Sequence, residues 1–263
     1  MLWLPVLLLP VLYILLIRPS LRRRFPPVLT GRGFAHRGLW NEKRPENTLS
    51  AFRSALEAGY GMEMDIRLSS DGVPVILHDP SLRRVFGTPE NVSDCPLSFL
   101  SSIHAPGTRE HVPTLQEVLD LVSGQVPLIL EIKSCRPRRA FLRSVQSCLD
   151  AYPGMYVVES FDPLILLWYR LHRPHVIRGQ LAFGLHGPRS AGFLPCLQSL
   201  LLQHVLSRPD FIAFDFRTEP SLPLKLVRLF RPVTAAWTLR SEEELKSLRA
   251  SYDLWIFEGF RPR

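Results

Sequence analysis

The feature that most constrains the fold of this chain is an alternation of short apolar runs with amphipathic stretches, which begins at Phe34 and continues to the end of the chain. The apolar runs predict strands at 34–36, 62–68, 73–78, 126–132, 155–159, 178–183, 211–215, 233–238 and 254–257. Strands that alternate with helices favour a parallel sheet. About 230 residues of this α/β pattern suit one closed TIM (β/α)₈ barrel.

Several segments between these runs carry helix or turn signals. Thr114 and Glu117 form a capping-box pattern ahead of a helix at 115–123, whose apolar residues recur on one face. An Asp-Pro pair is typical of the cap and first turn of a helix at 163–172. Asp71-Gly72, between two apolar runs, predicts a hairpin turn.

Composition excludes several classes of protein. The 263 residues are 46% hydrophobic and 21% charged, which supports a full core rather than a disordered chain. Four cysteines without metal-binding spacing are too few for a disulfide scaffold, so we expect free thiols. Of the net charge of +8, four positive charges, Arg18 and Arg22–Arg24, lie together near the N-terminus. No stripe of basic and aromatic residues accompanies them, and we expect no nucleic-acid partner.

Residues 1–17 are apolar and contain no charged side chain. As a helix they would span about 26 Å, just short of a hydrocarbon core of about 30 Å, and Arg18 could reach the membrane interface. The charges follow the apolar run and no small-residue cleavage site is present, which favours an uncleaved single-pass anchor. We expect a membrane anchor at 1–17, a basic linker at 18–33 and a domain at 34–263. The positive-inside rule would place that domain on the cytoplasmic side of the cell membrane. The alternative is an apolar helix packed on the domain.

Three carboxylates lie on predicted strands. Glu63 and Asp65 are two residues apart, so they project to one face while the apolar residues between and beside them take the other face. Glu131 follows Leu-Ile-Leu in the same manner. Carboxylates crowded together in apolar surroundings repel one another, and a divalent cation would relieve that repulsion. With no cysteine or neighbouring histidine pair among them, these residues favour Mg²⁺ or Ca²⁺ over Zn²⁺.

Two histidines and two cations accompany the carboxylates. His36 and His78 each end an apolar run, and in a barrel the carboxyl ends of the strands line the active site. Histidines at these positions can act as general acid and general base near neutral pH. Arg37 and Lys133 stand beside them, and cations next to a metal site suit a phosphate group.

At these residues the sequence resembles the glycerophosphodiester phosphodiesterase family. The matching strings, in the order of the family, are His36-Arg37-Gly38, Pro45-Glu46-Asn47-Thr48, Glu63-x-Asp65, Asp71-Gly72, His78-Asp79, Glu131-x-Lys133, Ser160-Phe161 and Trp237-Thr238. The resemblance covers roughly residues 33–260.

This resemblance implies a TIM barrel that uses one divalent cation, Mg²⁺ or Ca²⁺, to cleave glycerophosphodiesters to sn-glycerol 3-phosphate and an alcohol. It implies metal ligation by Glu63, Asp65 and Glu131, and an acid/base pair formed by His36 and His78. It further implies that Arg37 and Lys133 hold the phosphate and that Glu46 lies near the metal and the glycerol hydroxyls. In the implied mechanism the neighbouring hydroxyl of the substrate attacks phosphorus, and water then opens the cyclic phosphate.

Two departures from the family pattern stand out. Only residues 80–112 separate the His-Asp motif from the next helix, which leaves a shorter lid, and the last strand ends Phe257-Glu258-Gly259 where Thr-Asp is frequent. The N-terminal segment resembles that of a bacterial, membrane-tethered subgroup. The alternatives are a lysophospholipase D-type enzyme or another lipid phosphodiesterase on the same barrel, with a lysophospholipid as substrate, and a non-catalytic tethered binding protein.

Overall fold

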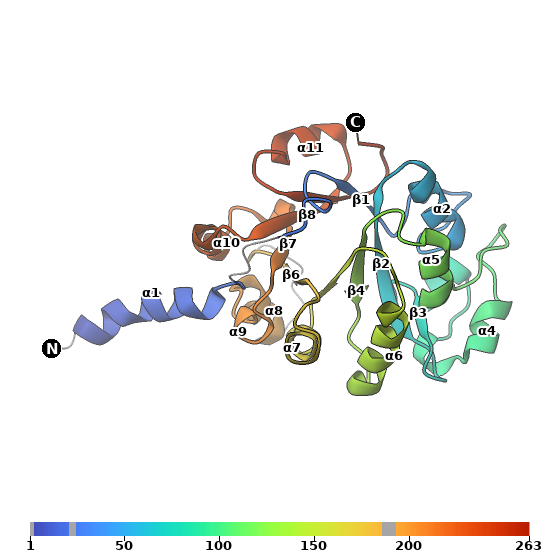
Figure 1. Ribbon diagram of the computed structural model, residues 1–263, viewed down its shortest axis with the longest axis horizontal. Helices are drawn as coiled ribbons and strands as arrows, with labels where there is room; N and C mark the ends of the chain where they lie inside the picture. The colour runs from blue at the N-terminus through green and yellow to red at the C-terminus, as the bar shows by residue number, and fades with distance from the viewer. Residues whose placement is uncertain (1–2, 21–24, 186–192, 263) are drawn as a thin grey trace.

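The computed structural model describes residues 3–20, 25–185 and 193–262, and within these ranges eight parallel strands form a closed barrel (Figure 1). The barrel strands are β1 (Gly33–His36), β2 (Gly61–Leu68), β4 (Leu128–Ile132), β5 (Tyr156–Ser160), β6 (Arg178–Ala182), β7 (Phe211–Asp215), β8 (Val233–Leu239) and β9 (Leu254–Phe257). Strand β1 pairs in parallel with both β2 and β9, which closes the barrel. The predicted TIM-type barrel is confirmed.

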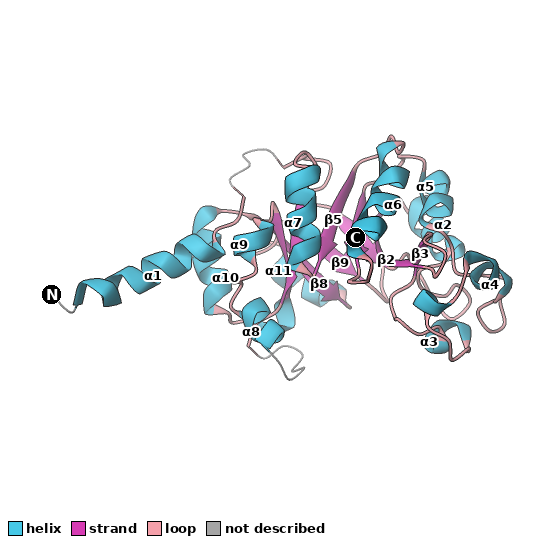
Figure 2. Ribbon diagram, turned by 90° about the horizontal axis from the view of Figure 1, so that it is seen from below, coloured by secondary structure: helices cyan, strands magenta, loops and turns pink. Residues whose placement is uncertain are grey.

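Helices cover the outside of the barrel (Figure 2). Those that follow the strands are α2 (Leu49–Glu57), α5 (Leu115–Val122), α6 (Arg138–Asp150), α7 (Pro163–His172), α8 (Phe193–Ser199), α9 (His204–Ser207), α10 (Leu222–Val227) and α11 (Glu242–Leu248). The capping box of Thr114 and Glu117 is present at the start of α5. At α7 the Asp162 side chain accepts a hydrogen bond from the Leu164 amide, as the Asp-Pro pair predicts.

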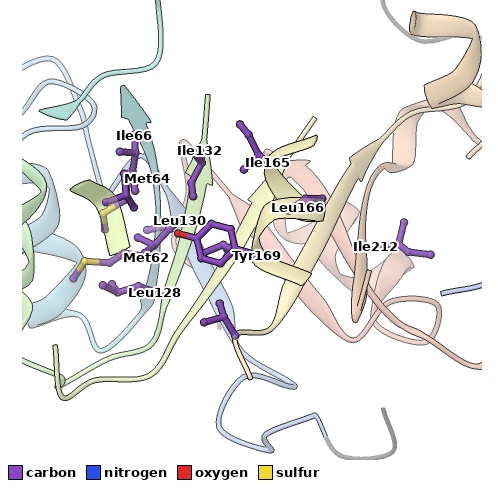
Figure 3. Close-up of a cluster of buried hydrophobic side chains, with 14 of the residues drawn as sticks. Met62, Met64, Ile66, Leu128, Leu130, Ile132, Ile165, Leu166, Tyr169 and Ile212 are labelled. Atoms are coloured by element: carbon purple, nitrogen blue, oxygen red, sulfur yellow. The ribbon is translucent and has the colours of Figure 1, made fainter. Parts of the chain in front are cut away.

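Strand β2 shows how the alternating pattern positions the site. Its apolar residues face the outer helices and pack with those of β4, α7 and β7 in the main core (Figure 3). Glu63 and Asp65 therefore face the interior of the barrel. The predicted hairpin at Asp71-Gly72 returns the chain to β3 (Pro74–Ile76), which pairs antiparallel with β2.

The interior of the barrel is filled by apolar side chains towards the amino-terminal ends of the strands. Phe34 and Phe211 are fully buried there, in a cluster with apolar residues of five other barrel strands. Glycines make room for both rings. A Cβ on Gly61 would lie 2.5 Å from the Phe34 ring, and one on Gly179 would lie 2.1 Å from the Phe211 ring. This filling leaves the carboxyl ends of the strands as the open end of the barrel.

A small lid lies between β3 and α5. It contains α3 (Arg83–Phe86), the 3₁₀ turn η1 (Val92–Asp94) and α4 (Leu97–Ser102). The lid has its own apolar cluster, which includes Leu82, Phe86 and Leu100. The short segment at 80–112 is therefore an ordered, packed unit.

The structure corrects the prediction of a single-pass membrane protein. The N-terminal helix α1 (Trp3–Ile17) has 15 residues, with Pro10 inside it. Fifteen residues of helix span about 22 Å, well short of a hydrocarbon core of about 30 Å. Among the described residues, no helix combines the length and apolar character needed to cross a membrane. The localisation predicted from residues 1–17 is therefore wrong.

The C-terminal end of α1 docks on the barrel, whereas the rest of the helix projects away from it (Figures 1 and 2). Ile17 is fully buried in the main core, and the Tyr13 hydroxyl donates to the Leu200 carbonyl at 2.9 Å. The buried imidazole of His204 bonds to the Ile17 carbonyl at 2.8 Å. Arg208 donates to three more carbonyls at this helix end.

The chain then passes beneath the barrel, in the segment predicted to be a basic linker. Arg22–Arg24 lie outside the described residues, but Leu29 is fully buried in the interior cluster. The Phe25 ring meets the Phe211 ring edge to face, with 6.0 Å between centroids. Residues 25–33 thus close the amino-terminal end of the barrel.

Candidate active site

A pocket of about 370 Å³ opens at the carboxyl ends of the barrel strands. Seven of the eight predicted site residues line it: His36, Arg37, Glu46, Glu63, His78, Glu131 and Lys133. The eighth, Asp65, is fully buried and its Oδ1 lies 2.7 Å from the Lys133 Nζ. A larger cavity of about 860 Å³ lies at the amino-terminal ends of β5–β8 and contains none of these residues. The structure therefore brings all eight predicted residues to one place.

Three buried carboxylates form the centre of the site. Glu63, Asp65 and Glu131 each offer an oxygen, and these oxygens lie within 4.8 Å of one another. Strand pairing produces this cluster, because Asp65 on β2 lies directly beside Glu131 on β4. Burial, followed by repulsion from Asp65 and other carboxylates, raises the pKa of Glu63 well above its ordinary value. A hard divalent cation bound by these oxygens would offset that repulsion, so the donor set fits Mg²⁺ or Ca²⁺.

Two cations face these carboxylates. Lys133 Nζ lies 2.7 Å from both Asp65 Oδ1 and Glu131 Oε1. Burial opposes the charge on Lys133, but attraction to Asp65 and Glu131 outweighs it and raises the lysine pKa. Burial likewise opposes the charge on Asp65, but attraction to Lys133, His78 and Arg37 together outweighs it and lowers the pKa of that carboxyl group. Arg37 Nε lies 3.4 Å from Asp65 Oδ2. Both cations thus stay charged at the edge of the pocket.

The backbone at Arg37 adopts a left-handed conformation, with φ of 58°. This turn directs the Arg37 amide at Glu63 Oε2, at 3.1 Å, and its carbonyl accepts the Asn47 amide at 2.9 Å. Next to it, Gly38 has φ of 81°, and a Cβ there would lie 2.9 Å from the Ala51 backbone. Asn47, also left-handed, donates from its side chain to Asp65 Oδ2 at 2.8 Å. The His-Arg-Gly and Pro-Glu-Asn-Thr strings therefore form one strained, interlocked support for the carboxylates.

Each histidine of the site is held by a carboxylate. His36 Nδ1 lies 2.7 Å from Glu258 Oε2, and His78 Nδ1 lies 2.6 Å from Asp79 Oδ1. The hydrogen bond from His36, with Arg240 beyond it, lowers the pKa of Glu258 to about 2. Burial lowers the pKa of His78. Each ring is oriented through Nδ1, which leaves Nε2 to act in the pocket.

Sequence reasoning noted Glu258 only as a departure at the end of the last strand. It did not pair this residue with His36, because 222 positions separate them. Closure of the barrel between β1 and β9 brings the two together. The signal that could have found this pair is an acidic residue at the carboxyl end of the strand that closes the barrel beside His36.

Arg84 is a second residue that sequence reasoning missed. From α3 in the lid it donates to both oxygens of Glu46 at 2.7 Å and to Asp79 Oδ2 at 2.6 Å. Burial alone would raise the pKa of Asp79, but the hydrogen bonds from Arg84 and His78 outweigh it and lower that pKa to about 2. Glu46 also accepts from Arg37 at 2.8 Å. Arg84 thus connects the lid to Asp79, which holds His78, and to Glu46, which holds Arg37.

Glu159, on β5, is a third residue that sequence reasoning missed. It is 1% exposed, lies directly beside Glu131 and lines the pocket. Burial, followed by repulsion from Glu131, raises its pKa well above the ordinary value. Its signal in the sequence is the same as that of Glu131, a lone carboxylate at the end of an apolar run.

The family comparison accounts for most of the chain. Residues 36–251 match the sequence profile of the Glycerophosphoryl diester phosphodiesterase family. A glycerophosphodiester phosphodiesterase of Caldanaerobacter subterraneus subsp. tengcongensis is 37% identical over 108 residues, covering 38% of this chain and 44% of that protein. Mouse glycerophosphodiester phosphodiesterase 1 is 32% identical over 176 residues, covering 59% of this chain and 52% of the mouse protein. The matches span about half the length of these curated relatives.

Solved structures share the fold. An Oleispira antarctica phosphodiesterase, in complex with the product sn-glycerol-3-phosphate, superposes with a TM-score of 0.72 at 22% identity, over 87% of this chain and 93% of that chain. A Thermotoga maritima glycerophosphodiester phosphodiesterase superposes with a TM-score of 0.67 at 27% identity, over 86% of this chain and 93% of that chain. Since the family profile extends over well more than half of its residues, the chain belongs to the glycerophosphoryl diester phosphodiesterase family.

Proposed function

We propose that this protein hydrolyses glycerophosphodiesters to sn-glycerol 3-phosphate and an alcohol, with one divalent cation, through a catalytic unit formed by residues 34–263. The observation that carries the proposal is the arrangement around one pocket. Two histidines, each oriented by a carboxylate, face three clustered carboxylates and two cations. Family membership and the product complex of the Oleispira antarctica relative support this choice of substrate.

Glu63, Asp65 and Glu131 are the residues that would hold the cation, as Mg²⁺ or Ca²⁺. When bound, such a cation supplies positive charge that stabilises the charge developing on phosphate oxygens. Lys133 and Arg37 hold the phosphate from the protein side, because their charged groups lie at the edge of the same carboxylate cluster. Glu46, held by Arg37 and Arg84, lies on this side of the pocket and contacts the glycerol moiety.

His36 and His78 form the acid/base pair. One imidazole takes the proton from the hydroxyl next to the phosphoester, whose oxygen then attacks phosphorus and forms a cyclic phosphate. The other imidazole gives a proton to the leaving alcohol oxygen, and water opens the cyclic phosphate with the two roles reversed. The contacts of Glu258 and Asp79 with Nδ1 stabilise whichever ring carries the extra proton.

The test is an assay of the full chain with glycerophosphoethanolamine, glycerophosphocholine and lysophosphatidylethanolamine, in Mg²⁺, in Ca²⁺ and in EDTA. We expect release of glycerol 3-phosphate that EDTA abolishes and that His36→Ala and Glu63→Gln each reduce by at least about 10²-fold. Glu57→Gln, an exposed carboxylate on α2, serves as the matched control and should be fully active. Lysophosphatidic acid formed from the lysolipid, with no glycerol 3-phosphate from the other substrates, would replace the proposal with a lysophospholipase D activity. No turnover by folded protein in either metal would refute an enzymatic function on these substrates.

A further inference from the structure

Glu159 is a buried carboxyl group whose hydrogen-bonding capacity is not used within the described protein. Its side chain lines the catalytic pocket and is 1% exposed, and its Oε2 has no hydrogen-bond partner among the described residues. A buried polar atom without a hydrogen-bond partner destabilises the folded protein. An unpartnered polar atom that lines a pocket therefore indicates that an atom of a ligand makes the missing hydrogen bond.

The position of Glu159 separates it from the three clustered carboxylates. Their oxygens meet within 4.8 Å, and Glu159 is not a member of that cluster. It lies one strand further round the barrel, on β5, so Glu131 stands between it and Asp65. The strand order also places it further than the cluster from β1, which carries His36. Glu159 therefore serves the part of the pocket away from the acid/base pair.

Part of the wall of the pocket that Glu159 lines is apolar. Phe161, Leu181 and Trp237 line the same pocket, and the rings of Phe161 and Trp237 meet edge to face with 5.8 Å between centroids. Lys133, whose charge acts on Glu159, is already bound by Asp65 and Glu131. An apolar wall with one hydrogen-bonding group suits a short carbon chain that ends in a hydroxyl group.

We propose that Glu159 binds the free terminal hydroxyl of the glycerol moiety, and that this contact selects deacylated glycerophosphodiesters over lysophospholipids. The proposal rests on the function proposed above and names the substrate class of the same site. The hydroxyl next to the phosphoester reacts near the histidines, so the terminal hydroxyl is the one that reaches the β5 side. Both a carboxylate and the carbonyl oxygen of a carboxylic acid accept a hydrogen bond from such a hydroxyl.

Acylation of that hydroxyl would remove the donor. A 1-acyl lysophospholipid carries an ester in its place, so Glu159 would stay buried and unpaired. Sites built to bind a hydroxyl reject analogues that lack it by large factors, for this reason. Glu159 is thus a specificity-determining residue, and its loss should affect binding of the glycerol end far more than the chemical step.

The test compares Glu159→Leu, which has no acceptor, with Glu159→Gln, which keeps a carbonyl oxygen. In the full chain, we expect Glu159→Leu to raise KM for glycerophosphoethanolamine by about tenfold or more, with kcat changed less than about threefold. Glu159→Gln should retain most of the wild-type KM. The preference for glycerophosphoethanolamine over lysophosphatidylethanolamine should fall by the same factor in the leucine variant.

Two measurements without turnover accompany the kinetics. By calorimetry, wild type should bind sn-glycerol 3-phosphate about tenfold or more tightly than 2-hydroxypropyl phosphate, which lacks the terminal hydroxyl, and Glu159→Leu should bind the two alike. Mg²⁺ and Ca²⁺ affinity should stay within about twofold in Glu159→Leu and fall sharply in Glu131→Gln. Thermal unfolding of both Glu159 variants establishes that they fold.

The outcomes are distinct. Equal discrimination against 2-hydroxypropyl phosphate by wild type and by Glu159→Leu would overturn the proposal, as would loss of metal affinity in both Glu159 variants, which would make the residue part of the metal site. If wild type cleaves none of the substrates, the proposed function fails, and the binding of the two phosphates still decides the role of Glu159.

Discussion

At the residue scale, the site depends on carboxylates that position histidines. His36 and His78 each bond through Nδ1 to an acidic side chain, at 2.7 and 2.6 Å. The acidic partners come from different places: Asp79 is adjacent to its histidine in the chain, whereas Glu258 arrives from the last barrel strand. Glu258 is in turn bound by Arg240, at 2.7 Å. Arg240 thus fixes the carboxylate that fixes the ring.

We expect Glu258→Gln to lower kcat by about 10²-fold or more and to leave KM within about threefold, because a neutral amide no longer stabilises the protonated ring or fixes its tautomer. Steady-state kinetics across pH would separate the effect on kcat from the effect on KM. Glu243→Gln, an exposed carboxylate on α11, is the matched control. A normal kcat in Glu258→Gln would show that His36 needs no positioning partner.

At the scale of elements, Arg84 joins the lid to the site. Arg84 binds Glu46 and Asp79 together, whereas its neighbour Arg83 is also exposed but forms no ion pair with a described residue. We expect Arg84→Met to lower kcat/KM by about tenfold, since both Glu46 and the Asp79 support of His78 lose their partner. Arg83→Met should behave as wild type.

The same substitution has a pH signature. The pKa of Asp79 is about 2 in the folded protein, below its ordinary value of 3.8, so this group stabilises the fold above about pH 4 and the stabilisation is lost as pH falls towards 2. In Arg84→Met the folded pKa should rise towards 3.8, and the acid unfolding curve should become less steep in that interval. Denaturant titrations between pH 2 and 5 would test this, and an unchanged slope would contradict it.

The docking of α1 should also depend on pH. Burial lowers the pKa of His204 to about 4, below the ordinary 6.5, so the unfolded chain binds more protons between these values. Stability should therefore decrease as pH falls from about 6.5 to 4, by at most about 3 kcal/mol. His204→Asn removes the titrating group, so the stability of this variant should change less between pH 6.5 and 4. His172→Asn, at an exposed position, should keep the wild-type pH dependence. Amide hydrogen exchange in α1 at pH 7 and pH 5 would locate the effect, and equal exchange at the two values would refute it.

The elements also show what sequence could and could not predict. The period-two pattern placed Glu63 and Asp65 inside the barrel, and the apolar run before Glu131 placed it alongside, so the cluster was predictable. Glu159 obeys the same rule but matched no motif, and only the register of β4 with β5 makes it a neighbour of Glu131. Arg84 was hidden because the direction of a lid side chain follows from packing of the lid rather than from periodicity. The N-terminal segment was misread because apolar composition alone does not give helix length or docking.

At the scale of the whole molecule, the proposed cation should stabilise the fold, because it would bind the buried carboxylates. A ligand at 100 times its Kd stabilises the folded state by about 2.7 kcal/mol, which for a protein of this size corresponds to roughly 5–10 °C in Tm. We expect Mg²⁺ or Ca²⁺ to raise Tm by this amount in wild type and EDTA to reverse it. Glu131→Gln should lose the shift and Glu57→Gln should keep it. A Tm that does not respond to either cation would contradict a metal site in this pocket.

The seam between β1 and β9 joins the first and last strands of the barrel, and it also assembles the pair of His36 and Glu258. Contacts this distant in sequence close late in folding, because the entropy of a long loop must be overcome before they form. During synthesis a nascent chain up to β5 would already contain both histidines, the carboxylate cluster and Lys133, yet His36 would lack Glu258. Under the proposed function, we therefore expect hydrolysis only after the ribosome has released the last strand, and we expect a product truncated before β9 to turn over no substrate.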